Sequence, residues 1–399
     1  MIEPFKKALP VLNRIEEAGY EAYFVGGAVR DYLIKREIHD VDIATSAFPE
    51  EIKGIFKSTV DVGIEHGTVL VIEKGEPYEI TTFRTESEYK DYRRPDKVTF
   101  IRSLDKDLER RDFTMNAMAM DARGAIIDPF HGKGAIEKRM IQTVGSADDR
   151  FTEDALRILR AVRFAGQLGF RLEKQTQAAL GRHAHLLEHI AIERILSEFE
   201  KLLNGKSKKE SIQLLTEAKI HHYLPGLSDK GTAINEIAKA DINSLTSNQM
   251  WLFLLFILEE PAPQEFLKRW KMPLKKIKYL TKSLQILRNR AKREWELLDL
   301  YEAGIQSAID VEIIYSVIKN QKSESKIMEN EMKRRFELLP IQERGDLDVT
   351  GNDLMIWRGQ AGGPWIKEEL QKIEHAVLNG IVKNEKAIIK EWLESWNRR

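Results

Sequence analysis

The 399-residue sequence contains no cysteine, which excludes disulfides, zinc–thiolate sites and thiol nucleophiles and gives secretion no support. It also lacks any apolar run that approaches the roughly 20 residues of a membrane span, and its charged N-terminus has no signal-peptide core. We therefore expect a cytoplasmic protein without membrane contact. The formal net charge of the sequence is zero. The 63 basic and 63 acidic residues balance, which disfavours a non-specific nucleic-acid binder but allows a localised basic face.

The character of the chain changes near residue 150. Before it, β-branched and aromatic runs between breakers predict strands at 21–25, 40–44, 67–73, 78–83, 117–121 and 125–128, with helices at 5–18 and 28–35. Beyond it, 3.6-residue apolar spacing predicts helices at 151–168, 192–203, 209–218, 249–258, 274–290 and 368–379. The pattern predicts an α+β fold with a mixed-sheet head (1–146), followed by an all-α neck (147–206), body (207–320) and tail (321–399).

A glycine pair stands where the first predicted strand turns into a helix. Residues 25–31 read Val-Gly-Gly-Ala-Val-Arg-Asp. Glycines let a backbone approach a ligand closely, and the helix N-terminus behind them offers free N–H groups to an anion. Gly27 would lie at that approach, and Arg30 in the first turn would add a clamp for a phosphate. A purely structural turn remains the alternative.

Two aspartates follow on the next predicted strand. Residues two apart on a strand share a face, so Asp40 and Asp42 would stand side by side. Aligned carboxylates are costly unless they bind positive charge, and hard cations such as Mg²⁺ take carboxylate oxygens. Glu79, on another predicted strand, is a candidate third carboxylate. The alternatives are exposure at a strand end, or a phosphohydrolase that begins with His39-Asp40, for which further spaced ligands are missing.

Four segments in this order resemble one family. They are residues 25–31, 40–45 (Asp-Val-Asp-Ile-Ala-Thr), 110–117 (Arg-Arg-Asp-Phe-Thr-Met-Asn-Ala) and 128–132 (Asp-Pro-Phe-His-Gly). They resemble the class II branch of the nucleotidyltransferase superfamily related to DNA polymerase beta, which holds bacterial CCA-adding enzymes and poly(A) polymerases. The resemblance is clear from about residue 20 to 205 and fainter towards the C-terminus.

The resemblance implies roles for particular residues. Position by position, Asp40 and Asp42 would hold Mg²⁺, Gly27, Arg30 and Arg111 would contact the incoming nucleotide, and Asp112 and Asn116 would act at its ribose. It also implies a helical region that holds tRNA. Dimerisation is typical of similar enzymes, so a homodimer is expected from the resemblance alone.

A charged face opens the predicted helix 151–168. At about 100° per residue, Glu153, Asp154, Arg157 and Arg160 fall within an arc of about 120°, with Arg163 beyond its edge. The plain interpretation is a solvated face with an i,i+3 pair between Asp154 and Arg157.

Base chemistry suggests more for this face. Cytosine and adenine both present an amino donor beside a ring-nitrogen acceptor, which an Asp and an Arg can read together. Guanine and uracil reverse that order. In the resembling family this Glu-Asp-x-x-Arg motif is the amino-acid template, and Arg160 and Arg163 match further nucleotide-contacting positions.

The remaining features are weaker. The polar segment 85–97 is expected to be a mobile loop, which in the resembling family helps the switch from C to A. Basic clusters at 206–209, 269–278 and 333–335 would contact tRNA phosphates, or would be solvated helix faces.

Together these features predict CCA addition to tRNA from CTP and ATP. Close alternatives are a partial enzyme that adds only CC or only A, and a poly(A) polymerase. A non-catalytic RNA-binding protein is the remaining alternative, against which the intact Asp40–Asp42 pair argues.

Overall fold

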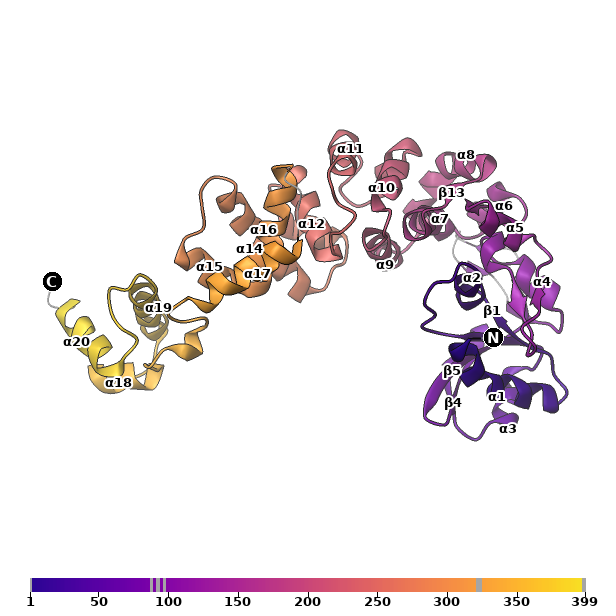
Figure 1. The fold of residues 1–399 in the computed structure, drawn as a ribbon, viewed down its shortest axis with the longest axis horizontal. Coiled ribbons are helices and arrows are strands. Elements are labelled where there is room, and N and C mark those ends of the chain that lie inside the picture. Colours follow the sequence, from indigo (N-terminus) through magenta and orange to yellow (C-terminus); the bar gives the residue numbers. More distant parts are fainter. Residues whose placement is uncertain (1, 87–88, 91–93, 96–97, 321–324, 397–399) are drawn as a thin grey trace. The chain divides into compact units, whose positions relative to one another are not determined.

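A mixed sheet forms the N-terminal part of the structure, a computed structural model that describes residues 2–86, 89–90, 94–95, 98–320 and 325–396 (Figure 1). Seven strands pair in the order β11-β10-β1-β2-β5-β4-β3. Their bounds are β1 Ala22–Val25, β2 Asp42–Thr45, β3 Thr59–Gly63, β4 Thr68–Glu73, β5 Glu76–Thr82, β10 Ala119–Met120 and β11 Ile126–Ile127. Every neighbouring pair is antiparallel except β2 and β5, which run parallel. The predicted mixed sheet is confirmed.

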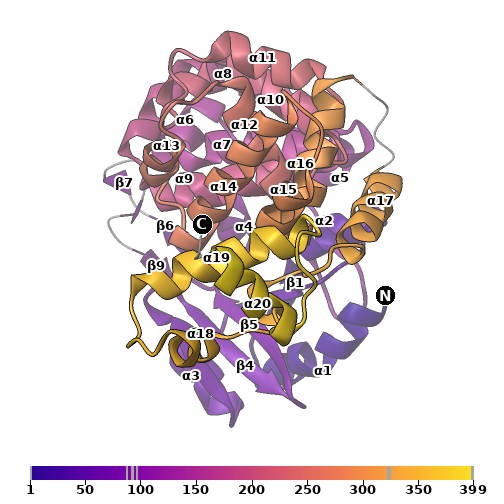
Figure 2. The same cartoon turned by 90° about the vertical axis from the view of Figure 1, so that its left-hand side faces the viewer.

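The sheet buries apolar side chains on both faces. Successive side chains of β1 point to opposite faces and enter two different cores. Phe24 points into a core shared with helix α1 (Glu3–Glu17), where α1 buries one apolar stripe. Val25 points into a second core with Phe83 and Leu108. Strands β4 and β5 lie side by side in Figure 2, joined by a tight hairpin. The two cores fix the sheet, so the ends of its strands are held in place.

Several short elements of the head escaped the sequence analysis. They are β3, the helices α3 (Pro49–Ile55), α4 (Leu104–Glu109) and α5 (Gly132–Glu137), and the 3₁₀ turns Ile64–His66 and Thr114–Asn116. Helix α2 (Gly27–Leu33) was predicted. The predicted strand 40–44 begins only at Asp42, because its partner β1 ends at Val25, where Gly26 turns with φ 71°. Asp40 therefore precedes the strand, and the alternation argument does not apply to it.

The predicted loop 85–97 lies partly outside the described residues. Its described parts form short ladders. Strand β6 (Arg84–Glu86) pairs with β9 (Val98–Phe100), and β7 (Tyr89–Lys90) pairs with β8 (Arg94–Pro95).

Helices dominate from residue 147 onward, as predicted. The helices of the first unit, Met1–Ala238, that follow the head are α6 (Ala147–Glu153), α7 (Leu156–Leu168), α8 (Lys174–His183), α9 (Ile192–Leu203), α10 (Lys208–Glu217) and α11 (Gly231–Lys239), whose last residue is the first of the second unit. The 3₁₀ turns Ala184–His189 and Ile220–Tyr223 also belong here. One short strand departs from the all-α prediction, since β13 (Arg171–Leu172) pairs in parallel with β12 (Met140–Ile141).

The single helix predicted over 151–168 is wrong, because the chain breaks between α6 and α7. Asp154 has extended backbone angles (φ −136°, ψ 101°), and its carboxylate accepts the backbone N–H of Leu156. This local bond competes with the continuation of the helix.

The second unit, Lys239–Arg399, contains helices joined by loops and no strand among its described residues. It contains α12 (Ser247–Ile257), α13 (Pro263–Arg269), α14 (Leu274–Arg290), α15 (Leu297–Ala303), α16 (Ile305–Ile318), α17 (Ser325–Glu337), the 3₁₀ turn Arg344–Asp346, α18 (Gly351–Arg358), α19 (Pro364–Leu378) and α20 (Lys386–Trp396). Asp310 of α16 accepts hydrogen bonds from Gln249 of α12 and Tyr279 of α14, which ties the three helices together. Within the described residues, no helix combines the length and apolar character that a membrane crossing requires.

Candidate nucleotide-binding site

A pocket of about 1060 Å³ opens in the first unit, between the strand ends of the head and helices α7 and α9. Twelve site residues were predicted from the sequence, and all of them line this pocket: Gly27, Arg30, Asp40, Asp42, Glu79, Arg111, Asp112, Asn116, Asp154, Arg157, Arg160 and Arg163. Residues from five separate segments of the sequence thus meet around one space.

Carboxylates gather on the strand side of the pocket. The parallel register of β2 and β5 sets Ile43 beside Ile80, so the preceding residues, Asp42 and Glu79, are neighbours. Asp42 keeps solvent access, yet the surrounding atoms of the pocket and then the charges of Glu79 and Asp40 raise its pKa, while Arg111 opposes the rise. The excess negative charge here is the environment that a divalent cation relieves.

The donor set fits a cation that is only partly held by protein. In the described part of the chain, no three acidic or histidine side chains converge at metal-ligand distance. Magnesium is commonly bound through one or two carboxylates, with waters and substrate phosphates as the other ligands. Asp40 and Asp42 meet that requirement.

The glycine turn brings backbone close to these carboxylates. A Cβ at Gly26 would lie 3.1 Å from Arg111 Nη1, so a larger residue would crowd this guanidinium, and 3.9 Å from Asp42 Oδ2, which is ordinary contact. Asp107 accepts a hydrogen bond from Arg111 Nη2 and orients this guanidinium. The buried Nε of Arg111 has no hydrogen-bond acceptor within the described residues.

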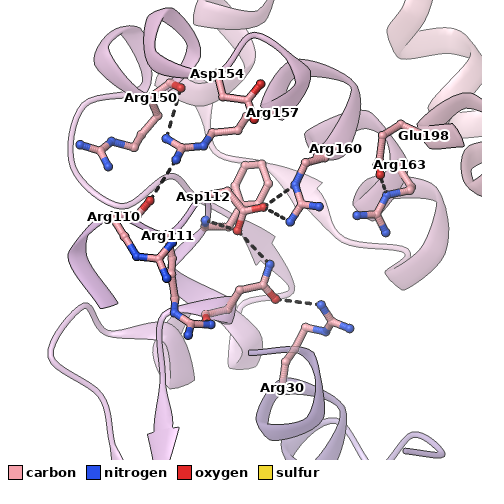
Figure 3. A network of polar contacts seen from close by, with 12 residues as sticks. Arg30, Arg110, Arg111, Asp112, Arg150, Asp154, Arg157, Arg160, Arg163 and Glu198 are labelled. Atoms are coloured by element: carbon pink, nitrogen blue, oxygen red, sulfur yellow. Dashed lines mark hydrogen bonds and ion pairs between the residues drawn. The ribbon is translucent and has the colours of Figure 1, made fainter. Parts of the chain in front are cut away.

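A chain of hydrogen bonds links α7 to α2 across the pocket wall (Figure 3). Arg160 donates to Asp112 Oδ2, Asn116 donates to Asp112 Oδ1, and Arg30 donates to Asn116 Oδ1. Burial alone would raise the pKa of Asp112, but Arg160 and the Asn116 amide outweigh it and lower the pKa to about 2. The Asp112 carboxylate therefore stays ionised and anchors the arginines around it.

Asp154 and Arg157 do not form the i,i+3 pair that the spacing predicted. Arg157 is 7% exposed and donates to Glu153 Oε2 (2.7 Å). It also donates to the carbonyl oxygen of Arg110 at 3.0 Å (Figure 3). Asp154 instead accepts from Arg194 of α9, at 3.2 Å. The prediction that these charged residues share one face of a single helix is therefore wrong, because Asp154 lies in the break between α6 and α7.

Three guanidinium groups lie close to one aromatic ring, that of Phe164. The Arg163, Arg30 and Arg160 guanidinium carbons lie 4.0, 5.1 and 5.6 Å from the centre of the Phe164 ring. The negative face of an aromatic ring attracts cations, so the ring offsets part of their mutual repulsion. Arg163 also pairs with buried Glu198 at 2.5 Å.

Further residues line the pocket that were not predicted as site residues, among them Phe164, Arg194, Arg110 and Lys201. Phe164 looked like an ordinary apolar helix position. Arg194 lies 40 residues from Asp154, and no local pattern connects the two.

A mixed sheet with carboxylates beside a glycine turn, facing arginine-bearing helices, is the arrangement of the nucleotidyltransferase class. The model of the poly A polymerase head domain matches residues 22–142, and that of the tRNA nucleotidyltransferase domain 2 matches residues 243–393. The CCA-adding enzyme of Bacillus cytotoxicus is 49% identical over 98% of this chain and 99% of its own length. The chain belongs to the family of CCA-adding enzymes.

Solved structures agree with this assignment. The CCA-adding enzyme of Bacillus stearothermophilus, in complex with CTP, is similar with a TM-score of 0.91 and 44% identity, and the match covers 100% of this chain and 98% of that one. The Thermotoga maritima CCA-adding enzyme complexed with tRNA has a TM-score of 0.65 and 22% identity, over 99% and 96% of the two chains. This second likeness concerns the fold alone.

Proposed function

We propose that this chain adds CCA to the 3′ end of tRNA from CTP and ATP and releases pyrophosphate. Full-length relatives named CCA-adding enzymes support the activity, and a similar structure holds CTP. The observation that carries the proposal is the pocket itself. It unites a carboxylate cluster suited to a cation with an Asp and an Arg suited to reading a base.

The chemistry assigned to the carboxylate side is phosphoryl transfer. The tRNA 3′ hydroxyl oxygen forms a bond to the nucleotide α-phosphorus, and the bond from that phosphorus to the oxygen bridging the α- and β-phosphates breaks. Pyrophosphate leaves with the bonding electrons, and the hydroxyl proton passes to solvent water. Asp40 and Asp42 would hold Mg²⁺, which when bound lowers the cost of an attacking alkoxide and of the departing pyrophosphate. Glu79 adds a third negative charge beside the pair.

The arginines and the glycine turn would hold the nucleotide. Gly27 lets the backbone approach, while Arg30, Arg111, Arg160 and Arg163 supply positive charge to the triphosphate or sugar. Asp112 and Asn116 are proposed to act at the ribose. Both are buried and already hydrogen-bonded to each other, so a ribose hydroxyl would join an ordered network.

Base choice is assigned to Asp154 and Arg157. The carboxylate accepts from the exocyclic amine of cytosine or adenine, and the guanidinium donates to the ring nitrogen. Guanine and uracil would place acceptor against acceptor and donor against donor, which is costly in a desolvated site.

The helical remainder is proposed to hold tRNA through the body (207–320) and tail (321–399). One basic cluster needs correction. Lys208, in the cluster 206–209, is only 1% exposed, and burial lowers its pKa to about 8, so its side chain does not face an RNA. The clusters at 269–278 and 333–335 remain candidates for phosphate contacts. A homodimer and a cytoplasmic location stay predictions from the sequence.

The direct test uses the purified protein with Mg²⁺, CTP and ATP and two tRNAs, one lacking CCA and one lacking only the final A. We expect products three and one nucleotides longer. Arrest after CC, or activity on the second tRNA alone, would indicate a partial enzyme. A long A ladder would indicate a poly(A) polymerase, and no product would favour an RNA-binding protein.

The metal assignment has its own test. Asp42→Ala should abolish nucleotide addition and leave tRNA binding within about twofold, because tRNA phosphates are contacted elsewhere. Asp61→Ala is the matched control. Asp61 lies on the exposed strand β3 and pairs with Lys53, away from the pocket. Unchanged addition by the Asp42 variant would overturn the assignment.

A further inference from the structure

Arg194 is a charged neighbour of the base-reading residues. It lies in the first turn of α9, and its side chain lines the pocket with 32% of its surface exposed. Its Nη2 donates to Asp154 Oδ2, while Asp154 Oδ1 accepts from the backbone N–H of Leu156. Each carboxylate oxygen is thus oriented by one donor. An ionised oxygen has lone pairs for a second donor, so the Asp154 carboxylate can still accept from a base.

Arg157 is held by a different set of partners. Glu153 and the carbonyl oxygens of Arg110 and Arg150 accept its N–H groups. Two oppositely charged residues three positions apart would ordinarily attract each other. A direct pair between Asp154 and Arg157 would consume the acceptor and the donor that a base needs. The structure contains two separate pairs instead, Glu153 with Arg157 and Asp154 with Arg194.

We propose that Arg194 is a positioning residue for base selection. By pairing with Asp154, it keeps that carboxylate from collapsing onto Arg157, so both side chains remain presented to the edge of cytosine or adenine. The inference rests on the proposed function of this pocket. The inference gives a residue of α9 a role in base specificity. The charge pattern of residues 153–163 alone does not predict that role.

The experiment measures discrimination in the full chain. KM and kcat are determined for CTP and UTP on tRNA lacking CCA, and for ATP and GTP on tRNA lacking the final A. Arg194→Met should reduce both discrimination ratios about tenfold, the order of coupling within one charge network. Most of the loss should appear as a higher KM for the correct nucleotides. Arg194→Lys, which keeps a cation near Asp154, should recover part of it.

Arg182→Ala is the matched control. Arg182 of α8 pairs with Asp148 of α6 at 2.8 Å, so it also forms a partly exposed Arg–Asp ion pair between distant segments of the first unit. Neither residue lines the pocket. We expect its discrimination ratios to equal those of the unmodified protein, which separates loss of a surface ion pair from loss of Asp154 positioning.

A second measurement asks whether Arg194 acts through Asp154. In the Asp154→Asn background, Arg194→Met should change discrimination by less than about twofold, because the carboxylate that it positions is gone. An equal tenfold loss in both backgrounds would overturn the inference and make Arg194 a direct nucleotide contact or a packing residue. Unchanged discrimination in the single variant would overturn it as well.

Equilibrium binding keeps this inference distinct from the proposed function. The preference for CTP over UTP is measured without tRNA, for the unmodified protein and for Arg194→Met. A protein that binds CTP preferentially but adds no nucleotide contradicts the proposed function, and the Arg194 variant still tests the positioning role. If the variant keeps the full binding preference, the positioning role is wrong.

Discussion

At the scale of single residues, Asp112 makes the stability of the site depend on pH. Arg160 and Asn116 lower its pKa to about 2, below the roughly 3.9 of an unfolded aspartate. A lowered folded-state pKa stabilises the fold above pH ~4, and that contribution is lost as the pH falls through about 2. Its size is ~2 kcal/mol.

Asp112→Asn tests this directly. We expect the variant to be less stable than the unmodified protein above pH ~4, and the difference in unfolding free energy to shrink towards pH 2. Urea unfolding at a series of pH values measures it, with Asp61→Asn as a surface control. Parallel curves for the Asp112 variant and the unmodified protein at all pH values would contradict the assigned pKa.

The site residues that were predicted from the sequence share one property. Each lies in a short segment whose own residue pattern is recognisable. Asp40, Asp42 and Arg111 stand in recognisable short patterns, and all three line the pocket. The partners of those residues could not be read this way. Arg194 reaches Asp154 only because α9 packs against α7, and packing between distant segments leaves no local pattern.

At the scale of elements, the contact of α7 with α10 depends on a glycine. An alanine Cβ at Gly166 would lie 2.1 Å from Ser211 Oγ and 3.2 Å from the carbonyl oxygen of Ser207. Ser211 Oγ donates to the Val162 carbonyl oxygen, so moving it breaks a buried hydrogen bond. Gly166→Ala should therefore lower the unfolding free energy by about 2 kcal/mol.

The control for this prediction is another helical glycine. A Cβ at Gly134 of α5 meets nothing within 4 Å, so Gly134→Ala should be neutral or stabilise the protein by up to ~1 kcal/mol through helix propensity. Urea unfolding compares the two variants. Equal stability changes would mean that the close approach of α7 and α10 is not what Gly166 provides.

Elements whose apolar spacing runs uninterrupted were predicted well, and α14 (Leu274–Arg290) agrees at both ends. The break between α6 and α7 was not foreseen. The apolar spacing continues through it, since Phe151 and Leu156 are both buried. Helix α6 ends where the Asp154 side chain accepts a hydrogen bond from the backbone N–H of Leu156. Hydrophobic periodicity carries no information about such a polar bond.

At the scale of the whole chain, nucleotide binding and tRNA binding should be separable. Among the described residues, every one that lines the pocket lies at or before Lys201, inside the unit Met1–Ala238. A fragment of residues 1–238 should therefore bind CTP within about threefold of the full chain, since nucleotide contacts need only that unit. Addition of CCA should fall at least about tenfold, because the fragment lacks the basic clusters at 269–278 and 333–335.

Salt dependence distinguishes the reasons for that fall. Each phosphate contact steepens the loss of RNA affinity with salt, so the full chain should show a steeper salt dependence of its KM for tRNA than the fragment. Calorimetry with CTP and gel assays of CCA addition between about 50 and 200 mM salt provide the two measurements. A folded fragment that binds no CTP would show that the second unit completes the nucleotide site. Equal rates of CCA addition and equal salt dependence of KM for the fragment and the full chain would show that residues 239–399 do not hold the tRNA. The tRNA contacts would then lie in the first unit.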